Sequence, residues 1–138
     1  MKILIMGLPG SGKSTLAKKL VEDLNELGKS AEWFNADKIR ETFDDWDFSE
    51  AGRERQTERM RKFAEEASTM GKIAVCDFVC PTHKLRTLFD ADVVVWMDTI
   101  ISSRYQDTND LFEAPLHYDY RIVEKNSFPW SKVLADKI

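Results

Sequence analysis

MKILIMGLPGSGKST, residues 1–15, is a short apolar run followed by a glycine-rich loop. Gly7, Gly12, Lys13 and Ser14 have the P-loop spacing of Gly, four residues, Gly, Lys and then Ser or Thr. In such loops backbone N–H groups surround phosphate oxygens, the lysine reaches the β- and γ-phosphoryl groups, and the hydroxyl can bind Mg²⁺. The stretch therefore predicts a site for ATP and Mg²⁺, formed by Gly7, Pro9, Gly10, Ser11, Gly12, Lys13, Ser14 and Thr15.

The residues on either side of this loop have the patterns that a P-loop requires. Residues 3–6 are all apolar, as in a buried parallel strand, and residues 14–27 carry a helical stripe of leucines. The positive N-terminal end of that helix would point at the same phosphates. A glycine-rich turn can also simply join a strand to a helix, but this setting favours a nucleotide site.

Length and composition predict one globular domain spanning residues 1–138. The chain is 43% hydrophobic and contains four tryptophans, which is typical of a protein with a packed core. Its formal charge of −4 supplies no overall field that would recruit nucleic acid or a membrane. An anionic substrate would have to be bound by local arginines.

The cysteines and the hydropathy pattern indicate a cytoplasmic protein. Cys76 and Cys80 lie four residues apart in a strand-like stretch, which favours reduced thiols in the core or lining a site over a disulfide. The first apolar run is too short for a signal peptide, and no segment reaches membrane-spanning length. We expect no membrane partner.

Strand and helix patterns alternate along the rest of the chain. This alternation predicts an α/β fold, a P-loop kinase-type three-layer sandwich in which a parallel five-stranded sheet has helices on both faces. In such folds ligands bind at the carboxyl ends of the strands. After the first strand, the expected strands are 31–35, 72–79, 92–98 and 119–123, and the expected later helices are 49–70, 83–89 and 128–138.

A kinase also needs a group that orients or deprotonates an acceptor hydroxyl. Asp37 follows the second expected strand and is the candidate base; the alternative is that it caps a helix starting near Lys38. Arg40 and Arg53 could clamp an anionic acceptor, because guanidinium groups form paired hydrogen bonds with phosphate. Arg55 and Arg59, an i, i+4 pair near glutamates, fit a solvated, salt-bridged helix face.

Three further side chains could complete such a site. Phe48 and Trp46 could stack on a base, although a phenylalanine in such a loop often fills the core instead. Asp77, near the end of the third strand, could bind Mg²⁺ or its water, with backbone hydrogen bonding as the alternative role. The two histidines are not expected to be catalytic, since phosphoryl transfer depends on positioning and charge.

Four blocks, GLPGSGKST, FNADKIR, FSEAGRERQTERMRKFAEEA and FVCPT, resemble the adenylylsulfate (APS) kinases over roughly the first two-thirds of the chain. That family phosphorylates the 3′-hydroxyl of adenosine 5′-phosphosulfate with ATP and Mg²⁺. The resemblance implies that Lys13 and Asp37 are catalytic. It also implies that the acceptor is bound by Asp37, Arg40, Phe48, Arg53, Gln56, Val79, Cys80 and Pro81.

The chain also departs from the family pattern. The family has Asp, Asn and Ser where this chain has Asn35, Gln56 and Cys80, and it usually has an Asp at the position of Gly52. The family's Arg-Asp-x-Lys-Gly-Leu-Tyr lid is absent, since residues 104–106 lead almost directly to LFEAP at 111–115. A shortened lid predicts a more open site, with weaker ATP capture or a different acceptor.

These observations predict an APS kinase-like phosphotransferase that acts on a small-molecule substrate, as a monomer or homodimer. One alternative is a small kinase acting on a nucleotide, nucleoside or polynucleotide hydroxyl, the only case in which nucleic acid is a partner. Another is a regulatory module that binds ATP without transferring its phosphate. P-loop and fold do not decide among these, because one fold supports many reactions.

Overall fold

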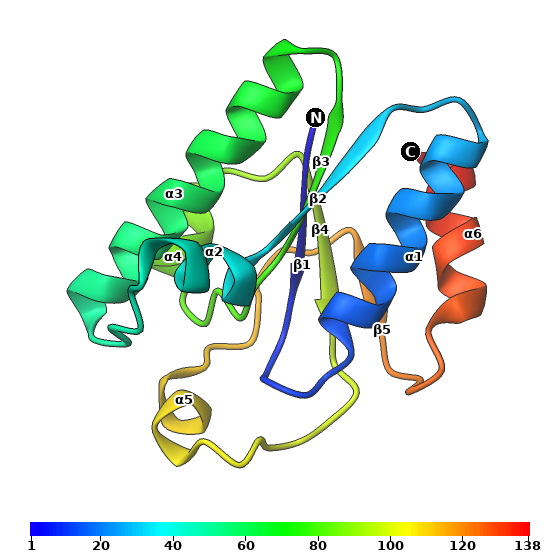
Figure 1. Ribbon diagram of the computed structural model, residues 1–138. Helices are drawn as coiled ribbons and strands as arrows, with labels where there is room; N and C mark the ends of the chain where they lie inside the picture. The colour runs from blue at the N-terminus through cyan, green and yellow to red at the C-terminus, as the bar shows by residue number, and fades with distance from the viewer.

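A computed structural model describes all residues from 1 to 138 and contains one five-stranded sheet (Figure 1). All strands are parallel and lie in the order β2-β3-β1-β4-β5. The predicted α/β fold class is confirmed. The strands are β1 (Lys2–Met6), β2 (Ala31–Asn35), β3 (Ile73–Asp77), β4 (Val93–Met97) and β5 (Tyr120–Ile122).

Helices cover both faces of this sheet. In Figure 1, α1 and α6 lie on one side of the strands and α2, α3 and α4 on the other, while α5 lies beyond the carboxyl ends of the strands. The layered arrangement is the predicted three-layer sandwich. The helices are α1 (Lys13–Glu26), α2 (Ala36–Phe43), α3 (Glu50–Thr69), α4 (His83–Phe89), α5 (Gln106–Leu111) and α6 (Phe128–Lys137).

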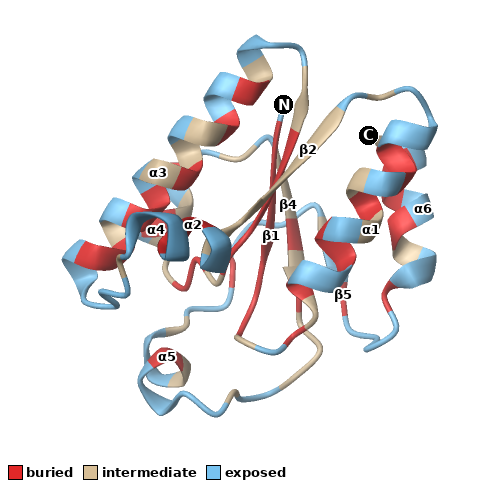
Figure 2. Ribbon diagram, viewed as in Figure 1, coloured by how far each residue is buried: buried red, intermediate tan, exposed pale blue.

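The central strand β1 separates two hydrophobic cores. Ile3 and Ile5 pack against α1 and α6, whereas Leu4 and Met6 pack against α3 and α4. All four side chains are completely buried, and β1 is buried almost throughout in Figure 2. A strand buried on both faces must be apolar at every position, which explains the continuous apolar run that leads into the P-loop.

The main boundary differences from the sequence prediction lie at the third strand and at the start of α2. The third strand was expected to extend from 72 to 79, but β3 ends at Asp77, which leaves the following residues free to form a loop at the sheet edge. Helix α2 begins at Ala36 because Asn35 is its N-cap; the Asn35 side chain accepts a hydrogen bond from Lys38 N at 3.0 Å. The proposed N-cap role for Asp37 was therefore wrong.

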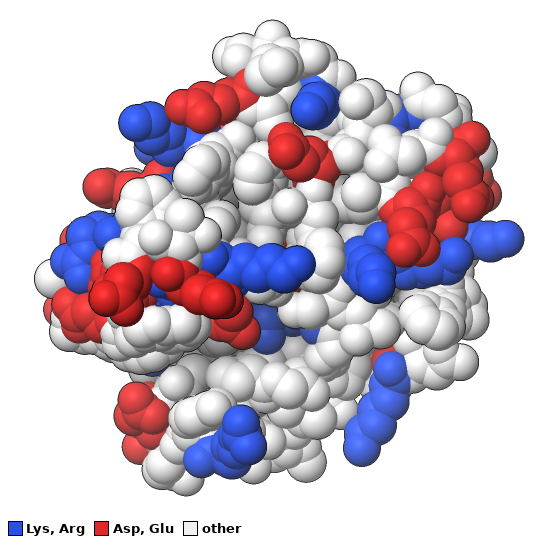
Figure 3. Space-filling model, in the orientation of Figure 1, with Lys and Arg blue, Asp and Glu red and all other residues white.

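The face of the molecule shown in Figure 3 carries both acidic and basic side chains. In Figure 3, acidic and basic side chains lie close together on the face shown, as expected for a chain with a formal charge of −4. None of the helices combines the length and apolar character needed to cross a membrane.

The C-terminal helix is joined to the first helix by a buried polar contact. Ser131 Oγ on α6 donates to Asp23 Oδ2 on α1 at 2.6 Å, and Lys19 Nζ lies 3.2 Å from Asp23 Oδ1. Burial alone would raise the pKa of Asp23, but the hydrogen bonds from Ser131 and Lys19 lower it below its ordinary value. The contact therefore stabilises the charged carboxylate.

We expect Ser131→Ala to lower the free energy of unfolding by about 1–3 kcal/mol at neutral pH, because it leaves a buried acceptor without its partner. The loss should be fully present above the ordinary carboxyl pKa of about 4 and should shrink as the pH falls below it. Urea unfolding across this pH range measures the effect. Ser30→Ala, at an exposed serine, is the control, and equal stability of the two variants at neutral pH would contradict the prediction.

Candidate active site

The carboxyl ends of the strands open into one cleft of about 1060 Å³. It is lined by the P-loop, the segment after β2, the face of α3, the loop after β3 and the segment that contains α5. Of the predicted site residues, only Gly7 and Ser11 do not line it. The others, Pro9, Gly10, Gly12, Lys13, Ser14, Thr15, Asp37, Arg40, Phe48, Arg53, Gln56, Asp77, Val79, Cys80 and Pro81, all do.

Gly7 and Ser11 lie on the side of the P-loop that contacts β4 and the segment after it. A Cβ atom at Gly7 would lie 2.6 Å from the carbonyl oxygen of Met97, so only glycine lets the loop pass this close to β4. The Thr99 hydroxyl donates to Ser11 O at 2.7 Å and ties the loop to the segment after β4. Ser11 Oγ is buried and has no hydrogen-bond partner, as expected in a loop that receives an anion.

Lys13 is a buried cation in this loop. Its Nζ donates to Leu8 O at 3.0 Å, and only 9% of the residue is exposed. Burial lowers the pKa of Lys13 to about 8, while the nearby carboxylates of Asp77 and Asp37 oppose that shift. A phosphate group beside Nζ would favour the charged form still further.

Asp77 lies next to Lys13 at the end of β3 and is 2% exposed. Its carboxylate accepts hydrogen bonds from Ser14 Oγ at 3.0 Å, from Trp33 Nε1 at 2.5 Å and from Asn35 Nδ2 at 3.2 Å. Burial raises the pKa of Asp77, and these donors act against the rise. The serine hydroxyl of the P-loop is therefore held against a buried carboxylate.

Ser14 and Asp77 offer the oxygen ligands that Mg²⁺ prefers. Ser14 Oγ and Asp77 Oδ1 are 3.0 Å apart and face the cleft together with Lys13. The chain has no group of three or more His, Cys, Asp or Glu that could hold a metal ion. A Mg²⁺ ion would therefore need further ligands from nucleotide phosphates and water, which is its usual way of binding in such sites.

Asp37 is exposed in the first turn of α2 and lines the cleft. The structure gives its carboxylate no hydrogen-bond partner, and it lies close enough to Lys13 to influence the pKa of that lysine. An exposed carboxylate beside the phosphate loop can reach a bound substrate. This geometry fits the predicted role as an orienting group or base.

Arg40 and Arg53 are buried, with 5% and 8% exposure, yet neither forms a salt bridge. Arg40 Nη1 donates to two backbone carbonyls of the loop after α2 at 2.9 and 3.3 Å, and Arg53 donates to Phe48 O and to Thr108 Oγ1. The two guanidinium carbons lie 4.2 and 5.5 Å from the centre of the Phe48 ring. Two buried positive charges with neutral partners can bind an anion in the cleft.

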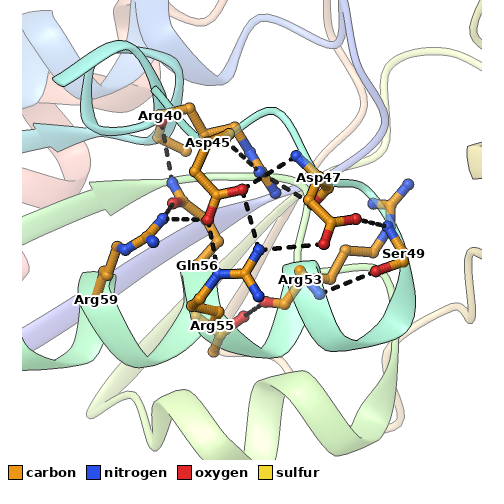
Figure 4. A network of polar contacts seen from close by, with 11 residues as sticks. Arg40, Asp45, Asp47, Ser49, Arg53, Arg55, Gln56 and Arg59 are labelled. Atoms are coloured by element: carbon orange, nitrogen blue, oxygen red, sulfur yellow. Dashed lines mark hydrogen bonds and ion pairs between the residues drawn. The ribbon is translucent and has the colours of Figure 1, made fainter. Parts of the chain in front are cut away.

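The loop that carries Phe48 is held on α3 by an ion-pair network (Figure 4). Asp45 lies 2.7 Å from Arg55 Nε and 2.8 Å from Arg59 Nη1, and Asp47 lies 3.1 Å from Arg55 Nη2. Hydrogen bonds from Arg55 are the main cause of the lowered pKa of Asp45. Arg55 and Arg59 are thus salt-bridged as predicted, but with aspartates of this loop instead of glutamates along their own helix.

The segment before and within α5 closes one side of the cleft. Asn109 Oδ1 accepts hydrogen bonds from Ser103 N and Oγ at 2.8 and 2.7 Å, and Asn109 Nδ2 donates to Ser103 O. Thr108, 6% exposed, accepts a hydrogen bond from Arg53 Nη2 at 3.2 Å. This short segment is therefore folded on itself and attached to Arg53.

The loop after β3 forms another wall through Val79, Cys80 and Pro81. Cys80 has a left-handed backbone with φ of 45°, and its carbonyl accepts a hydrogen bond from Arg86 Nε at 3.0 Å. Both Cys76 and Cys80 are free and buried, as predicted. Burial raises the pKa of Cys80 to about 12, so its thiol remains protonated and serves as a neutral part of the wall.

The sequence matches the family model for adenylylsulphate kinase over residues 1–113. This chain belongs to the adenylylsulfate kinase family. Relatives include a probable adenylyl-sulfate kinase of Pyrococcus abyssi, 29% identical over 100 residues that make up 72% of this chain and 58% of the relative. The adenylyl-sulfate kinase of Escherichia coli K12 is 36% identical over 83 residues, or 59% of this chain and 41% of that enzyme. The chain thus spans about half the length of the curated relatives that it matches.

A solved adenylylsulfate kinase has the same fold. The Mycobacterium tuberculosis APS kinase CysC, in complex with AMPPNP and APS, superposes with a TM-score of 0.79 at 22% identity. The superposition covers 99% of this chain and 93% of that one. At this identity the similarity establishes the shared fold.

The structure explains two departures of this adenylylsulfate kinase family member. The family has an aspartate at the position of Gly52, but here a Cβ atom would overlap the backbone oxygen of Asp47. Gln56 Nε2 donates to Ala36 O at 3.0 Å, so the side chain predicted to contact the acceptor also holds the start of α2. Gly52 thus lets the loop of Asp47 lie close to α3, and Gln56 joins α3 to the start of α2.

Sequence reasoning missed two residues of this site. Trp33 was assigned only to a strand, although its spacing of two from Asn35 places both side chains on one face of β2. Thr108 lies outside every strand and helix expected from the sequence, and its partner Arg53 is 55 positions away. The strand alternation could have indicated Trp33, whereas no local signal could have indicated Thr108.

We expect nucleotide binding to weaken as the pH rises through about 8, because Lys13 loses its proton there in the free protein. Binding above this pH should take up a proton, since the phosphates raise the pKa of the lysine. Titration calorimetry in buffers of different ionisation enthalpy measures both effects. Lys18→Met, at an exposed lysine of α1, should retain the pH dependence, and Lys13→Met should lack it; equal pH profiles for the two variants would contradict the assignment.

We also expect Gly52→Ala to destabilise the protein by about 1–3 kcal/mol, because the new methyl group forces the loop of Asp47 away from α3. Thermal or urea unfolding measures the loss. Glu58→Ala, at an exposed position of the same helix, is the control for the change in helix composition. Unchanged stability of Gly52→Ala relative to this control would show that the loop adapts without cost.

Proposed function

We propose that this chain is an ATP-dependent kinase that transfers the γ-phosphate of ATP to the 3′-hydroxyl of adenosine 5′-phosphosulfate. The proposal rests on the set of residues that line one cleft. Lys13 and Asp37 lie beside the phosphate loop, while Arg40 and Arg53 offer buried positive charge beside the half-exposed ring of Phe48. Family membership and the APS-bound structure of a relative support the choice of acceptor.

The P-loop side of the cleft would bind the donor. Backbone N–H groups of the loop and the N-terminal end of α1 favour the phosphates, and Lys13 Nζ would leave Leu8 O to reach the β,γ-bridging region. Ser14 Oγ would bind Mg²⁺, and Asp77 would face the ion or its water. When bound, the ion would reduce the negative charge on the phosphates.

Phosphoryl transfer would take place between the two sides. The acceptor oxygen forms a bond to the γ-phosphorus while the bond from that phosphorus to the β,γ-bridging oxygen breaks, and ADP leaves. Asp37 orients the acceptor hydroxyl and receives its proton. Lys13 stabilises the charge that develops on the bridging oxygen.

The acceptor side would recognise both an anion and a base. Arg40 and Arg53 each keep N–H groups beyond those bonded to neutral protein partners, so they can donate to a phosphosulfate or phosphate. The ring of Phe48 is 49% exposed and Trp46 is 51% exposed, and both line the cleft. Exposed aromatic rings next to guanidinium groups suit a flat base that carries an anionic group.

A second candidate is transfer to the hydroxyl of another nucleotide, a nucleoside or a polynucleotide. Gln56 favours it, because its amide nitrogen is bonded to Ala36 O where the family has an asparagine that contacts APS. The shortened lid favours it as well, because a shorter lid predicts a more open site. The donor site is the same in both cases.

With ATP, Mg²⁺ and APS, we expect the protein to form a 3′-phosphorylated product. Lys13→Ala and Asp37→Asn should each lower turnover by about 10²- to 10⁴-fold, as is usual when a positioned charged group is removed. Glu41→Gln, at an exposed carboxylate of α2, should leave turnover nearly unchanged. Coupled ADP detection and chromatography of the product measure these rates.

The outcome separates the candidates. If folded protein binds ATP but forms no product from APS, the APS assignment is wrong, and parallel assays with other hydroxyl acceptors test the second candidate. If ATP binds tightly and no acceptor is phosphorylated, the chain is a nucleotide-binding module and the kinase assignment is wrong. Near-normal turnover of Asp37→Asn would remove Asp37 from the mechanism.

A further inference from the structure

The carboxylate of Asp77 is held by neutral donors on both of its oxygens. Oδ1 accepts from Ser14 Oγ at 3.0 Å and from Asn35 Nδ2 at 3.2 Å. Oδ2 accepts from Trp33 Nε1 at 2.5 Å and from Asn35 Nδ2 at 3.2 Å. These donors come from β2 and the P-loop, so the position of the carboxylate is determined from two sides.

Asn35 makes this arrangement possible because its amide has one acceptor and one donor end. Its Oδ1 accepts the hydrogen bond from Lys38 N that caps α2, and its Nδ2 donates to Asp77 and to Ser14. Asn35 and Asp77 are register partners in the sheet, so their side chains emerge next to each other. An aspartate could cap the helix, but it would place a second carboxylate within 3.2 Å of Asp77, where like charges repel.

Trp33 supplies the remaining donor. It precedes Asn35 by two residues on β2, so both side chains point to the same face of the sheet. The indole N–H can only donate, which suits a carboxylate oxygen. Lys38 Nζ lies 5.0 Å from the centre of the indole ring and helps to fix the orientation of the ring.

We propose that Asn35 and Trp33 are positioning residues that hold Asp77 against Ser14. The carboxylate that faces the metal ion would then come from β3, and not from position 35, where the family has an aspartate. Ser14 Oγ donates to Asp77 Oδ1 and accepts from Asn35 Nδ2, so one oxygen lone pair of Ser14 remains to bind a cation. The inference rests on the proposed ATP and Mg²⁺ site but does not depend on the acceptor.

The hydrogen bonds between Asn35 and Asp77 require two different side-chain groups at these register partners. One member must be an amide and the other a carboxylate, whichever strand carries which. Asn35→Asp gives the family's residue but creates two adjacent carboxylates. Asp77→Asn leaves two amides and no carboxylate at these two positions. The double variant Asn35→Asp/Asp77→Asn exchanges the two groups and again gives one of each, which makes a double-mutant cycle informative.

The test compares the affinity for AMPPNP, a non-hydrolysable ATP analogue, in MgCl₂ and in EDTA by titration calorimetry. The dissociation constant in EDTA divided by the dissociation constant in MgCl₂ measures how strongly Mg²⁺ supports nucleotide binding. We expect each of Asn35→Asp, Asp77→Asn and Trp33→Phe to reduce this ratio by about 10- to 100-fold, as is typical when a residue that supports a metal ligand is changed. The double variant should recover most of the loss.

Two matched controls exclude a general effect of the substitutions. Asn25→Asp changes an asparagine that bonds only the backbone of Ala31, and Trp130→Phe removes an indole hydrogen bond to Glu124, away from the cleft. Both controls should keep the wild-type ratio. Affinity in EDTA and circular dichroism show whether each variant retains a folded P-loop.

Specific results would overturn the inference. An unchanged ratio in Asn35→Asp or in Trp33→Phe would mean that these residues do not act on the metal, and so would a double variant that is as defective as the worse single variant. A wild-type ratio near one would overturn it together with the metal assignment. Lack of APS phosphorylation with a normal wild-type ratio would count against the proposed acceptor and would leave the inference in place.

Discussion

The buried carboxylate of Asp77 sets the geometry of the donor side of the cleft. It is 2% exposed, and the segments around it contribute neutral hydrogen-bond donors together with the nearby charge of Lys13. A buried carboxylate without these partners would cost several kcal/mol. The end of β2, the end of β3 and the first turn of α1 therefore have to meet at this point, and the open cleft lies directly next to it.

The proposed acceptor side of the cleft has buried positive charge instead of a buried carboxylate. Arg40 and Arg53 are buried without carboxylate partners, because the carboxylates of Asp45 and Asp47 pair with Arg55 and Arg59 on the outer side of the same loop. The loop thus turns its backbone carbonyls toward the inner arginines and its charged side chains toward the outer ones (Figure 4). This division keeps the inner guanidinium groups in place while their charge remains available to a ligand.

Local signals in the sequence were enough for most of the fold. The apolar run before the P-loop, the long helix predicted over 49–70 and the short strand ending at Asn35 each follow from residues close together in the chain. The start of α2 was not decided locally, because Asn35 and Asp37 are both good N-cap residues. In the structure Asn35 is the cap, and its amide nitrogen also donates to Asp77, 42 positions later. Similarly, Arg55 and Arg59 have glutamates nearby in the sequence, but their partners are aspartates brought close by the turn after α2.

The site also contains residues that sequence motifs indicate and residues that they do not indicate. Every residue that sequence motifs assigned to the cleft lies in it or supports it, because a P-loop and an acceptor arginine have recognisable neighbours. The spacing of Trp33 from Asn35 indicates only that both side chains share a face of β2, and no local signal indicates Thr108, since the contacts of both residues join segments that come together only in the folded chain. Thr108 has a particular consequence for the short segment with α5. This segment is bonded directly to Arg53 through Thr108. Arg53 Nε donates to Phe48 O and Arg53 Nη2 donates to Thr108 Oγ1, so one guanidinium group joins the loop after α2 to the segment with α5.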